Sequence, residues 1–169
     1  MANQPNNIVL GEGVFAIGTT DIGLTRGGGT FTVEREYREI PADGDYGIVK
    51  GRLEKVRSIP KLVMNALELL PANLPKMYPA TKVETLTTTD TITAKENIED
   101  TDYQDVVTWT GKTKGGRGVK ITIENAINLE NIDWSLVDKD EIVAQLTYTG
   151  TYLETARTTE PWKVEFTGA

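Results

Sequence analysis

The sequence predicts a single domain that is mostly antiparallel β, with one short helix. Apolar and polar residues alternate along several segments, which is the pattern of strands buried on one face. Clusters of Gly, Pro, Asp and Asn separate these segments and predict turns. A chain of 169 residues buries about 70% of its unfolded surface, which is enough for one core.

Composition excludes several function classes. The chain has no His and no Cys, so disulfides, Ser-His and Cys-His sites and most zinc sites are ruled out. The net charge of -7 is uneven, because residues 1–84 carry ten basic and ten acidic side chains whereas residues 85–169 carry eight and fifteen. An acidic chain without a basic face is a poor candidate for gripping DNA. Without a signal peptide or a long apolar run, we expect a soluble protein made inside the cell.

The N-terminal third predicts short strands followed by a long hairpin. Residues 8–10 and 14–17 are expected to be strands, with turns at "GTTDIG" and "TRGGG". In the next strand Phe31, Val33, Arg35 and Tyr37 share one face, and Thr30, Thr32, Glu34, Glu36 and Arg38 share the other. The turn "PADGDYG", residues 41–47, leads into a second extended segment at 49–57.

Charge pairing predicts the register of this hairpin. Glu39 would face Lys50, Arg35 would face Glu54, Glu34 would face Lys55 and Val33 would face Val56. A slip of one residue would set Glu34 against Glu54. Opposite charges across a ladder contribute about 0.2–1 kcal/mol, so the first register is favoured.

The segment "IPKLVMNALELL" allows two interpretations. Its apolar spacing over residues 61–70 favours a helix, although a strand buried on both faces would also be apolar throughout. Residues 71–78, "PANLPKMY", predict a short helix of their own, because Pro71 suits a helix start.

The remaining chain predicts further strands. Residues 83–93 are rich in Thr and β-like, and residues 95–105 form an acidic loop. Strands are expected at 107–110 and 119–127, joined by "GKTKGGRG", and at 141–153. Trp162, Val164 and Phe166 mark a closing strand.

Motifs that suggest chemistry have simpler explanations. "GEGVFA" at 11–16 matches a dinucleotide-binding pattern, but no helix can follow it, so we interpret it as a turn. "GKT" at 111–113 lacks the first glycine of a phosphate-binding loop and fits a hairpin turn. The acidic stretches "DTDYQD" and "DKDE" lack the Gly and Glu of a calcium loop, so we expect solvated acids and no metal or cofactor. A carboxylate pair for glycoside hydrolysis remains open, with little support from the scattered aromatic residues.

The hairpin at 30–57 is therefore the most informative feature. It would leave strand edges open to aggregation unless they are paired or covered. It could be a solvated hairpin on a β-sandwich. Alternatively, identical hairpins from several copies could join edge to edge and close a barrel that one copy cannot make.

The chain resembles the tail tube (major tail) proteins of long-tailed bacteriophages. The resemblance rests on "GEGVFAIGTTDIGLTRGGGTFTVEREYREIPADGDYGIVKGR", "VKITIENAINLENIDWS", "KDEIVAQLTYTGTY" and "PWKVEF", and so spans nearly the whole chain. It implies one tail-tube-like domain over residues 1–169, a β-sandwich with one flanking helix, and an N-terminal arm at 1–7. It also implies a strand at 61–70 and a helix within 71–78.

The resemblance further implies hexameric rings that stack into a hollow tube, a structural part of the virion rather than an enzyme. Candidate residues facing the bore are Glu34, Glu36 and Arg38, and candidate contacts between subunits or rings are Asp43, Asp45, Tyr46, Lys50, Arg52 and Lys55. Residues 1–7 are further candidates for contacts between rings. Like charge in such a bore keeps DNA from sticking, and here either Glu34 and Glu36 or the acidic second half would supply it.

The expected partners are other copies, a tape measure protein, the tail terminator and distal tail proteins, and double-stranded DNA in passage, without membrane insertion. The chain would be made in the host bacterial cytoplasm and reside in the virion tail. Two alternatives remain: the inner tube of a contractile tail or injection device, and a monomeric β-sandwich that binds a sugar or another ligand.

Overall fold

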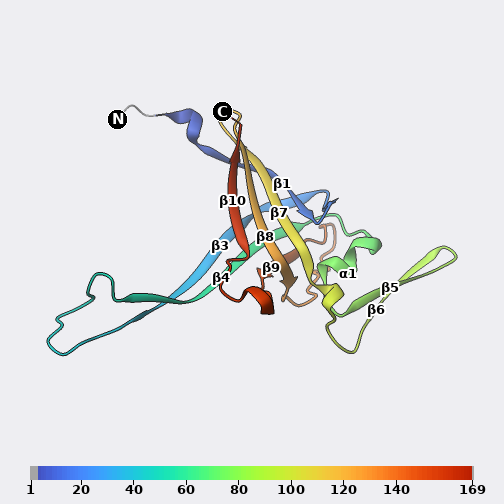
Figure 1. Ribbon diagram of the computed structural model, residues 1–169. Helices are drawn as coiled ribbons and strands as arrows, with labels where there is room; N and C mark the ends of the chain where they lie inside the picture. The colour runs from blue at the N-terminus through green and yellow to red at the C-terminus, as the bar shows by residue number, and fades with distance from the viewer. Residues whose placement is uncertain (1–3, 169) are drawn as a thin grey trace.

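The computed structural model describes residues 4–168, and antiparallel strands dominate them (Figure 1). The strands are β1 (Val9–Ile17), β2 (Thr20–Asp21), β3 (Thr25–Glu39), β4 (Leu53–Ala66), β5 (Thr81–Leu86), β6 (Thr89–Ala94), β7 (Gln104–Thr113), β8 (Gly118–Asn128), β9 (Ala144–Gly150) and β10 (Trp162–Thr167). The one α-helix is α1 (Leu74–Met77), and 3-10 turns occupy Pro5–Asn7, Pro71–Asn73, Asp100–Asp102 and Glu154–Ala156.

One sheet contains eight of the strands and folds over itself. Its order is β2-β1-β7-β8-β9-β4-β3, and β10 pairs with β8. The first half of β8 pairs with β10 and its second half with β9, so the sheet divides at β8 into two layers. The result is sandwich-like and is not closed as a barrel. The predicted mostly β, antiparallel fold with one short helix is confirmed, whereas a barrel built from several copies stays a prediction.

The core lies between these layers, and α1 covers its end. Alternate residues of β4, from Ser58 to Ala66, are buried, as are Leu146 and Tyr148 of β9. Met77 of α1 is fully buried, and the Tyr148 hydroxyl donates to the Lys76 carbonyl oxygen at 2.9 Å. The helix is therefore held on the sheet by both apolar packing and a partly buried hydrogen bond.

Asn128, at the end of β8, connects three segments through one buried side chain. Its Nδ2 donates to the Met77 carbonyl oxygen at 2.7 Å. Its Oδ1 accepts from the backbone N–H groups of Glu130 and Thr147, each at 3.0 Å. Only 1% of the residue is exposed, so this amide satisfies backbone groups that water cannot reach.

Most strand predictions are confirmed, with changes at their ends. Residues 9–10 and 14–17 belong to one strand, β1, whose pairing with β7 is irregular between Val9 and Gly13, and residue 8 lies just before it. "GEGVFA" therefore lies in a strand rather than in a turn. A Cβ on Gly13 would lie 2.4 Å from the Trp109 ring, so the glycine makes room for that indole. "TRGGG" is also not a turn, because Gly27 and Gly28, both at positive φ, form an irregular stretch inside β3.

The resemblance predicted residues 61–70 better than periodicity did. The segment continues β4 as far as Ala66, because β3 and β9 pair both of its edges. One face is buried, and on the other face the apolar Ile59 and Val63 alternate with Lys61 and Asn65. Apolar residues therefore do not keep to alternate positions, and their spacing resembles that of a helix. Residues 67–70 lie outside the strand, and the predicted helix within 71–78 is α1 with its preceding 3-10 turn.

The predicted register of the long hairpin is wrong. Glu39 pairs with Leu53, Arg35 with Ser58 and Val33 with Pro60. Packing of Phe31 opposite the buried Leu62 fixes the inner part of the ladder. Exposed ion pairs contribute less free energy to a given register than the burial of these apolar side chains does. The second strand also begins at Leu53 rather than at residue 49, so the connection is longer than the predicted turn.

Replacing Asn128 by alanine should lower the free energy of unfolding by about 2–4 kcal/mol, because three backbone partners lose a buried hydrogen bond. Urea unfolding of the monomer measures this change. Asn131→Ala, at an exposed position nearby, is the control and should change stability by less than about 0.5 kcal/mol. Equal stabilities of the two variants would contradict the connecting role of Asn128.

Candidate assembly surfaces

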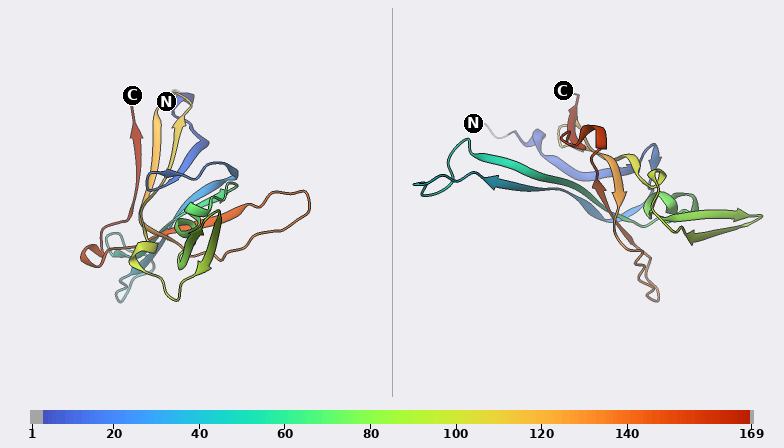
Figure 2. Two further views of the ribbon diagram at one scale, coloured as in Figure 1. Left: turned by 90° about the vertical axis from the view of Figure 1, so that its right-hand side faces the viewer. Right: turned by 60° about the horizontal axis from the view of Figure 1, so that its bottom comes forward.

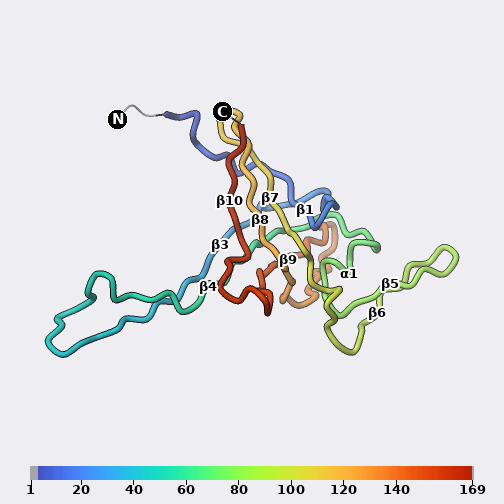
Figure 3. Tube along the Cα trace, in the orientation of Figure 1, coloured from blue at the N-terminus to red at the C-terminus, as the bar shows by residue number. Residues whose placement is uncertain are grey.

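The end of the β3–β4 hairpin projects far from the body (Figures 1 and 3). A bulge separates this projection from the sandwich: Glu36 pairs with Arg57 and Tyr37 with Lys55, which leaves Val56 as an extra residue. Such a bulge bends a strand and increases its twist. The hairpin beyond it carries six exposed large apolar side chains, which are Tyr37, Ile40, Tyr46, Ile48, Leu53 and Val56.

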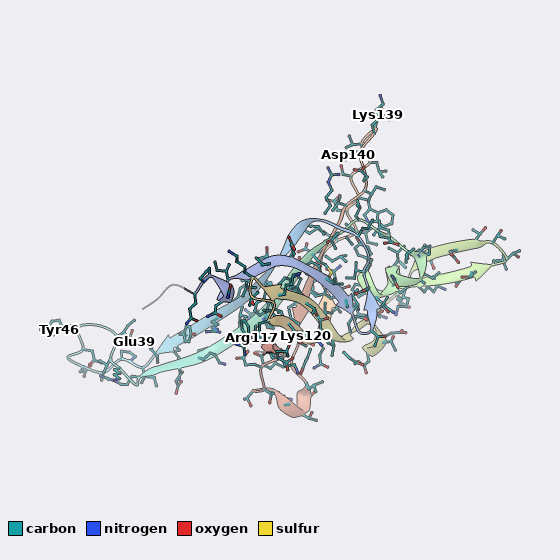
Figure 4. The ribbon with its side chains drawn as sticks, turned by 90° about the horizontal axis from the view of Figure 1, so that it is seen from above. Glu39, Tyr46, Arg117, Lys120, Lys139 and Asp140 are labelled. Atoms are coloured by element: carbon teal, nitrogen blue, oxygen red, sulfur yellow. The ribbon has the colours of Figure 1, made fainter. Side chains whose placement is uncertain are left out.

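The tip loop, residues 40–52, is ordered by its own contacts. The Asp45 carboxylate accepts from the Ala42 N–H at 2.7 Å and from the Arg52 guanidinium at 2.8 Å. The Ile40 N–H donates to the Arg52 carbonyl oxygen at 3.0 Å. Tyr46 is fully exposed at the end of this loop (Figure 4). The loop therefore holds an apolar tip in a defined shape, which lowers the entropy lost on binding a partner.

The residues predicted as contacts fall into two groups. Asp43, Tyr46 and Lys50 are exposed on the tip loop, where a neighbour could reach them. Asp45 and Arg52 pair with each other, so they organise the loop. Lys55 lies beside the bulge and pairs with Glu160 in the same subunit. A role of any of them between subunits remains a prediction, and residues 1–3 of the predicted N-terminal arm lie outside the described residues.

The residues predicted to face the bore do share one exposed face. Glu34 pairs with Lys61 at 2.7 Å, and Arg38 pairs with Glu54 at 2.5 Å. Cross-strand pairing places three acids and three bases on this face, namely Glu34, Glu36, Glu54, Arg38, Arg57 and Lys61. The face is balanced in charge rather than acidic. The hypothesis that Glu34 and Glu36 make the bore acidic therefore has no excess of acid on this face to support it.

A polar cluster forms at the base of the hairpin, and sequence reasoning missed it. The bulge shifts the alternation of β4, so that Lys55 turns toward the face on which Ser58 and Pro60 are buried. There its ammonium donates to Glu160. The Glu160 carboxylate also accepts from the Tyr152 hydroxyl at 3.1 Å and from Trp162 Nε1 at 3.0 Å. No spacing in the sequence links Lys55 to a residue so distant in the chain.

The electrostatics of this cluster favour the ionised carboxylate. The Lys55 ammonium lowers the pKa of Glu160 to about 2, although partial burial opposes this shift. The same hydrogen bond raises the pKa of Lys55. Beside the cluster a cleft of about 560 Å³ opens between β4 and residues 149–160. No strand pairs with β4 on this side before Lys61, and Pro60, which has no N–H, lies where the pairing with β9 ends.

Two open strand edges complete these surfaces. β3 is the last strand of its sheet, and its outer edge has no strand partner among residues 4–168. β10 likewise pairs only with β8 within that range. Across residues 4–168 no group of three or more acids is placed to hold a metal ion, and no helix there is long and apolar enough to cross a membrane. The described geometry thus favours contact with extended polypeptide.

No protein-family model matches the sequence, and no curated protein matches it either. Among solved structures, the fold is similar to the cap of the anti-feeding prophage, which is described as a tube-terminating cap. The TM-score is 0.57 at 9% sequence identity, and the match covers 98% of this chain and 95% of the cap chain. The likeness therefore extends over the whole fold, including the long hairpin.

Acid should destabilise the monomer through Glu160. Its folded pKa lies below that of an ordinary carboxyl, so its contribution is complete above about pH 5 and is lost as the pH falls toward about 2. Glu160→Gln should cost about 1–2 kcal/mol at neutral pH and flatten this pH dependence, as measured by urea unfolding. Glu154→Gln, which breaks an exposed ion pair with Arg157, should cost less than about 0.5 kcal/mol. The same loss in both variants would contradict the assignment.

Proposed function

We propose that this protein is the major tail tube subunit of a bacteriophage, whose copies form hexameric rings that stack into a hollow tube. The observation that carries the proposal is the projecting hairpin, whose apolar residues and outer edge have no partner in the described chain. Exposed apolar side chains on a long edge strand mark an interaction site. Sister copies supply both a strand edge and an apolar surface that fit it.

The fold likeness supports the same reading. The similar structure is a protein that terminates a tube, and the similarity extends over 98% of this chain. A subunit within a tube and one at its end both bind a ring through one face. A subunit within the tube must also bind a ring through its opposite face. The two projecting hairpins, β3–β4 and β5–β6, point in opposite directions and offer one contact for each side (Figure 1).

The proposed conduit acts passively on DNA. On the face predicted to line the bore, Lys61 and Arg38 pair with carboxylates of their own subunit, and Arg57 lies opposite Glu36 in the ladder. Cations paired in this way release few counterions on meeting phosphates, so they hold DNA weakly. A balanced bore would let the genome pass, and a tape measure protein would occupy it beforehand. Terminator and distal tail proteins would bind the two ends of the tube, and no cofactor or catalytic step is required.

Two other functions remain candidates. The cap similarity favours a part of an injection device, either its inner tube or the subunit that ends it. A cap would form one ring and stop, because its outer face need not bind another ring. The monomeric ligand-binding sandwich is less favoured, because it leaves the exposed apolar hairpin without a role.

Concentrating the purified protein should produce rings or open-ended tubes in negative-stain electron microscopy, with a matching rise in sedimentation coefficient. Exposed edges and apolar tips drive this association. Discrete rings that never stack would favour the cap. A protein that stays monomeric at every concentration, while retaining a defined ligand, would contradict the tube and support the binding module.

The double variant Tyr46→Ser, Ile48→Ser should abolish stacking while the monomer keeps its stability within about 0.5 kcal/mol, since both side chains are exposed. Electron microscopy should then show single rings in place of tubes. Leu70→Ser, at an exposed position outside the hairpin, should leave the tubes intact and is the control. Tubes of normal length in the double variant would show that the tip makes no contact between rings.

A further inference from the structure

Residues 129–143, here called the acidic arm, form a third projection, of which the sequence analysis singled out only the acidic stretch "DKDE". They connect β8 to β9 and contain five carboxylates and one lysine. Trp134 anchors the arm, because its ring packs against the core and its Nε1 donates to the Tyr78 hydroxyl at 3.1 Å. Arg26 of β3 holds the returning side through ion pairs with Asp140 and Glu141. The arm is thus positioned as a unit.

The arm carries exposed apolar side chains and backbone groups that form no hydrogen bonds with other backbone groups. Leu136 is 80% exposed and Val137 is 58% exposed. Within the described residues 4–168, the backbone of residues 131–136 forms no hydrogen bond with other backbone groups. Val137 begins a turn, in which its carbonyl oxygen accepts from the Asp140 N–H. The arm therefore presents two exposed apolar side chains beside a turn, next to a stretch without backbone partners, and this suits contact with another polypeptide.

The cleft beside Glu160, here called the basic cleft, has the matching properties. The residues that line it include three bases, Lys55, Arg57 and Arg157, one acid, Glu160, and the apolar residues Val56 and Ile59. Lys55 and Arg157 have carboxylate partners in the described chain, whereas Arg57 has none there. The unpaired edge of β4 forms one wall, so the cleft offers positive charge, apolar surface and free backbone groups together.

The acidic arm and the basic cleft lie on opposite sides of the subunit. In Figure 4, Lys139 and Asp140 mark the end of the arm at the top, and the Glu154–Ala156 turn beside the cleft lies at the bottom. The left view of Figure 2 shows the same separation. In Figure 4 the two hairpins extend to the left and to the right, so the direction from the arm to the cleft runs crosswise to the direction from one hairpin to the other. Complementary surfaces on opposite sides of one chain generate a ring or a filament of identical copies.

We propose that the acidic arm of one copy docks in the basic cleft of the next copy and is the contact that joins neighbours within a ring. Val137 packs on Val56 and Ile59, while Asp138 pairs with Arg57. The proposal rests on self-assembly of the chain, as argued under the proposed function, and adds to it the identity of the lateral contact. The hairpin contacts then remain available for stacking.

The absence of cysteine allows a direct test by disulfide trapping. Assembled Val137→Cys, Thr158→Cys protein is oxidised and run on a denaturing gel. The arm and cleft of one copy cannot meet, so each disulfide joins two copies and a ladder up to the closed ring is expected. Each single variant should remain without a ladder. The control pair Leu70→Cys, Thr158→Cys places one cysteine at an exposed position outside the arm, the cleft and both hairpins, and should give no ladder.

A charge reversal tests the proposed pairing. Arg57→Glu should lower the cross-linked fraction about tenfold, and adding Asp138→Arg in the same chain should restore it. Both positions are exposed, so urea unfolding should show a folded monomer that is at most about 1 kcal/mol less stable, because Arg57→Glu sets a second carboxylate opposite Glu36. Rings visible in electron microscopy without a ladder would overturn the arm contact and leave the tube intact. Failure of every variant and of the parent chain to assemble would overturn the tube itself.

Discussion

The structure depends on one constraint: the backbone groups along the outer edge of β3 need hydrogen-bonding partners. This strand has fifteen residues, and among residues 4–168 it pairs on one side only. Proteins commonly block such edges with proline, with lysine or with a covering segment. Within β3 there is neither proline nor lysine. Six of its fifteen residues are charged, yet no strand or proline blocks the edge within the described chain. An edge of this length fits a pairing surface, which is what the proposed assembly requires.

The bulge at Val56 divides that hairpin into two parts with different roles. On the inner side, Leu62 and Phe31 pack in the core and fix the register. On the outer side, apolar residues point to solvent and the tip loop is organised by Asp45. The bulge also turns Lys55 toward Glu160, so the bend is braced by a charged pair. The extra residue Val56 therefore marks the point where the buried part of β4 passes into the projecting end of the β3–β4 hairpin.

Local patterns in the sequence predicted most of the strands and the helix, but not the strand register or the contacts between distant segments. Alternation identified β8 and β10, and Pro71 marked the short helix, because these signals depend on neighbours in the chain. The register of β3 on β4 could not be predicted from charges, since burial of Leu62 outweighs exposed ion pairs. The Lys55–Glu160 pair and the basic cleft bring together segments that are far apart in the sequence, and no local pattern predicts such contacts.

The distribution of acid now has a structural explanation that differs from repulsion of DNA. The excess of carboxylates lies in the second half of the chain, and five of them gather on the acidic arm. The arm projects away from the β3–β4 face, whose own charges are balanced. Screened charges act over about 8–10 Å in physiological salt, so acids on a separate projection contribute little to a field at that face. In the proposed assembly, attraction between the acidic arm of one copy and the basic cleft of the next favours this pairing. Repulsion between two acidic arms disfavours contacts of arm with arm. In the proposed assembly, the acidity of the chain would therefore serve the order of the subunits rather than the lining of the bore.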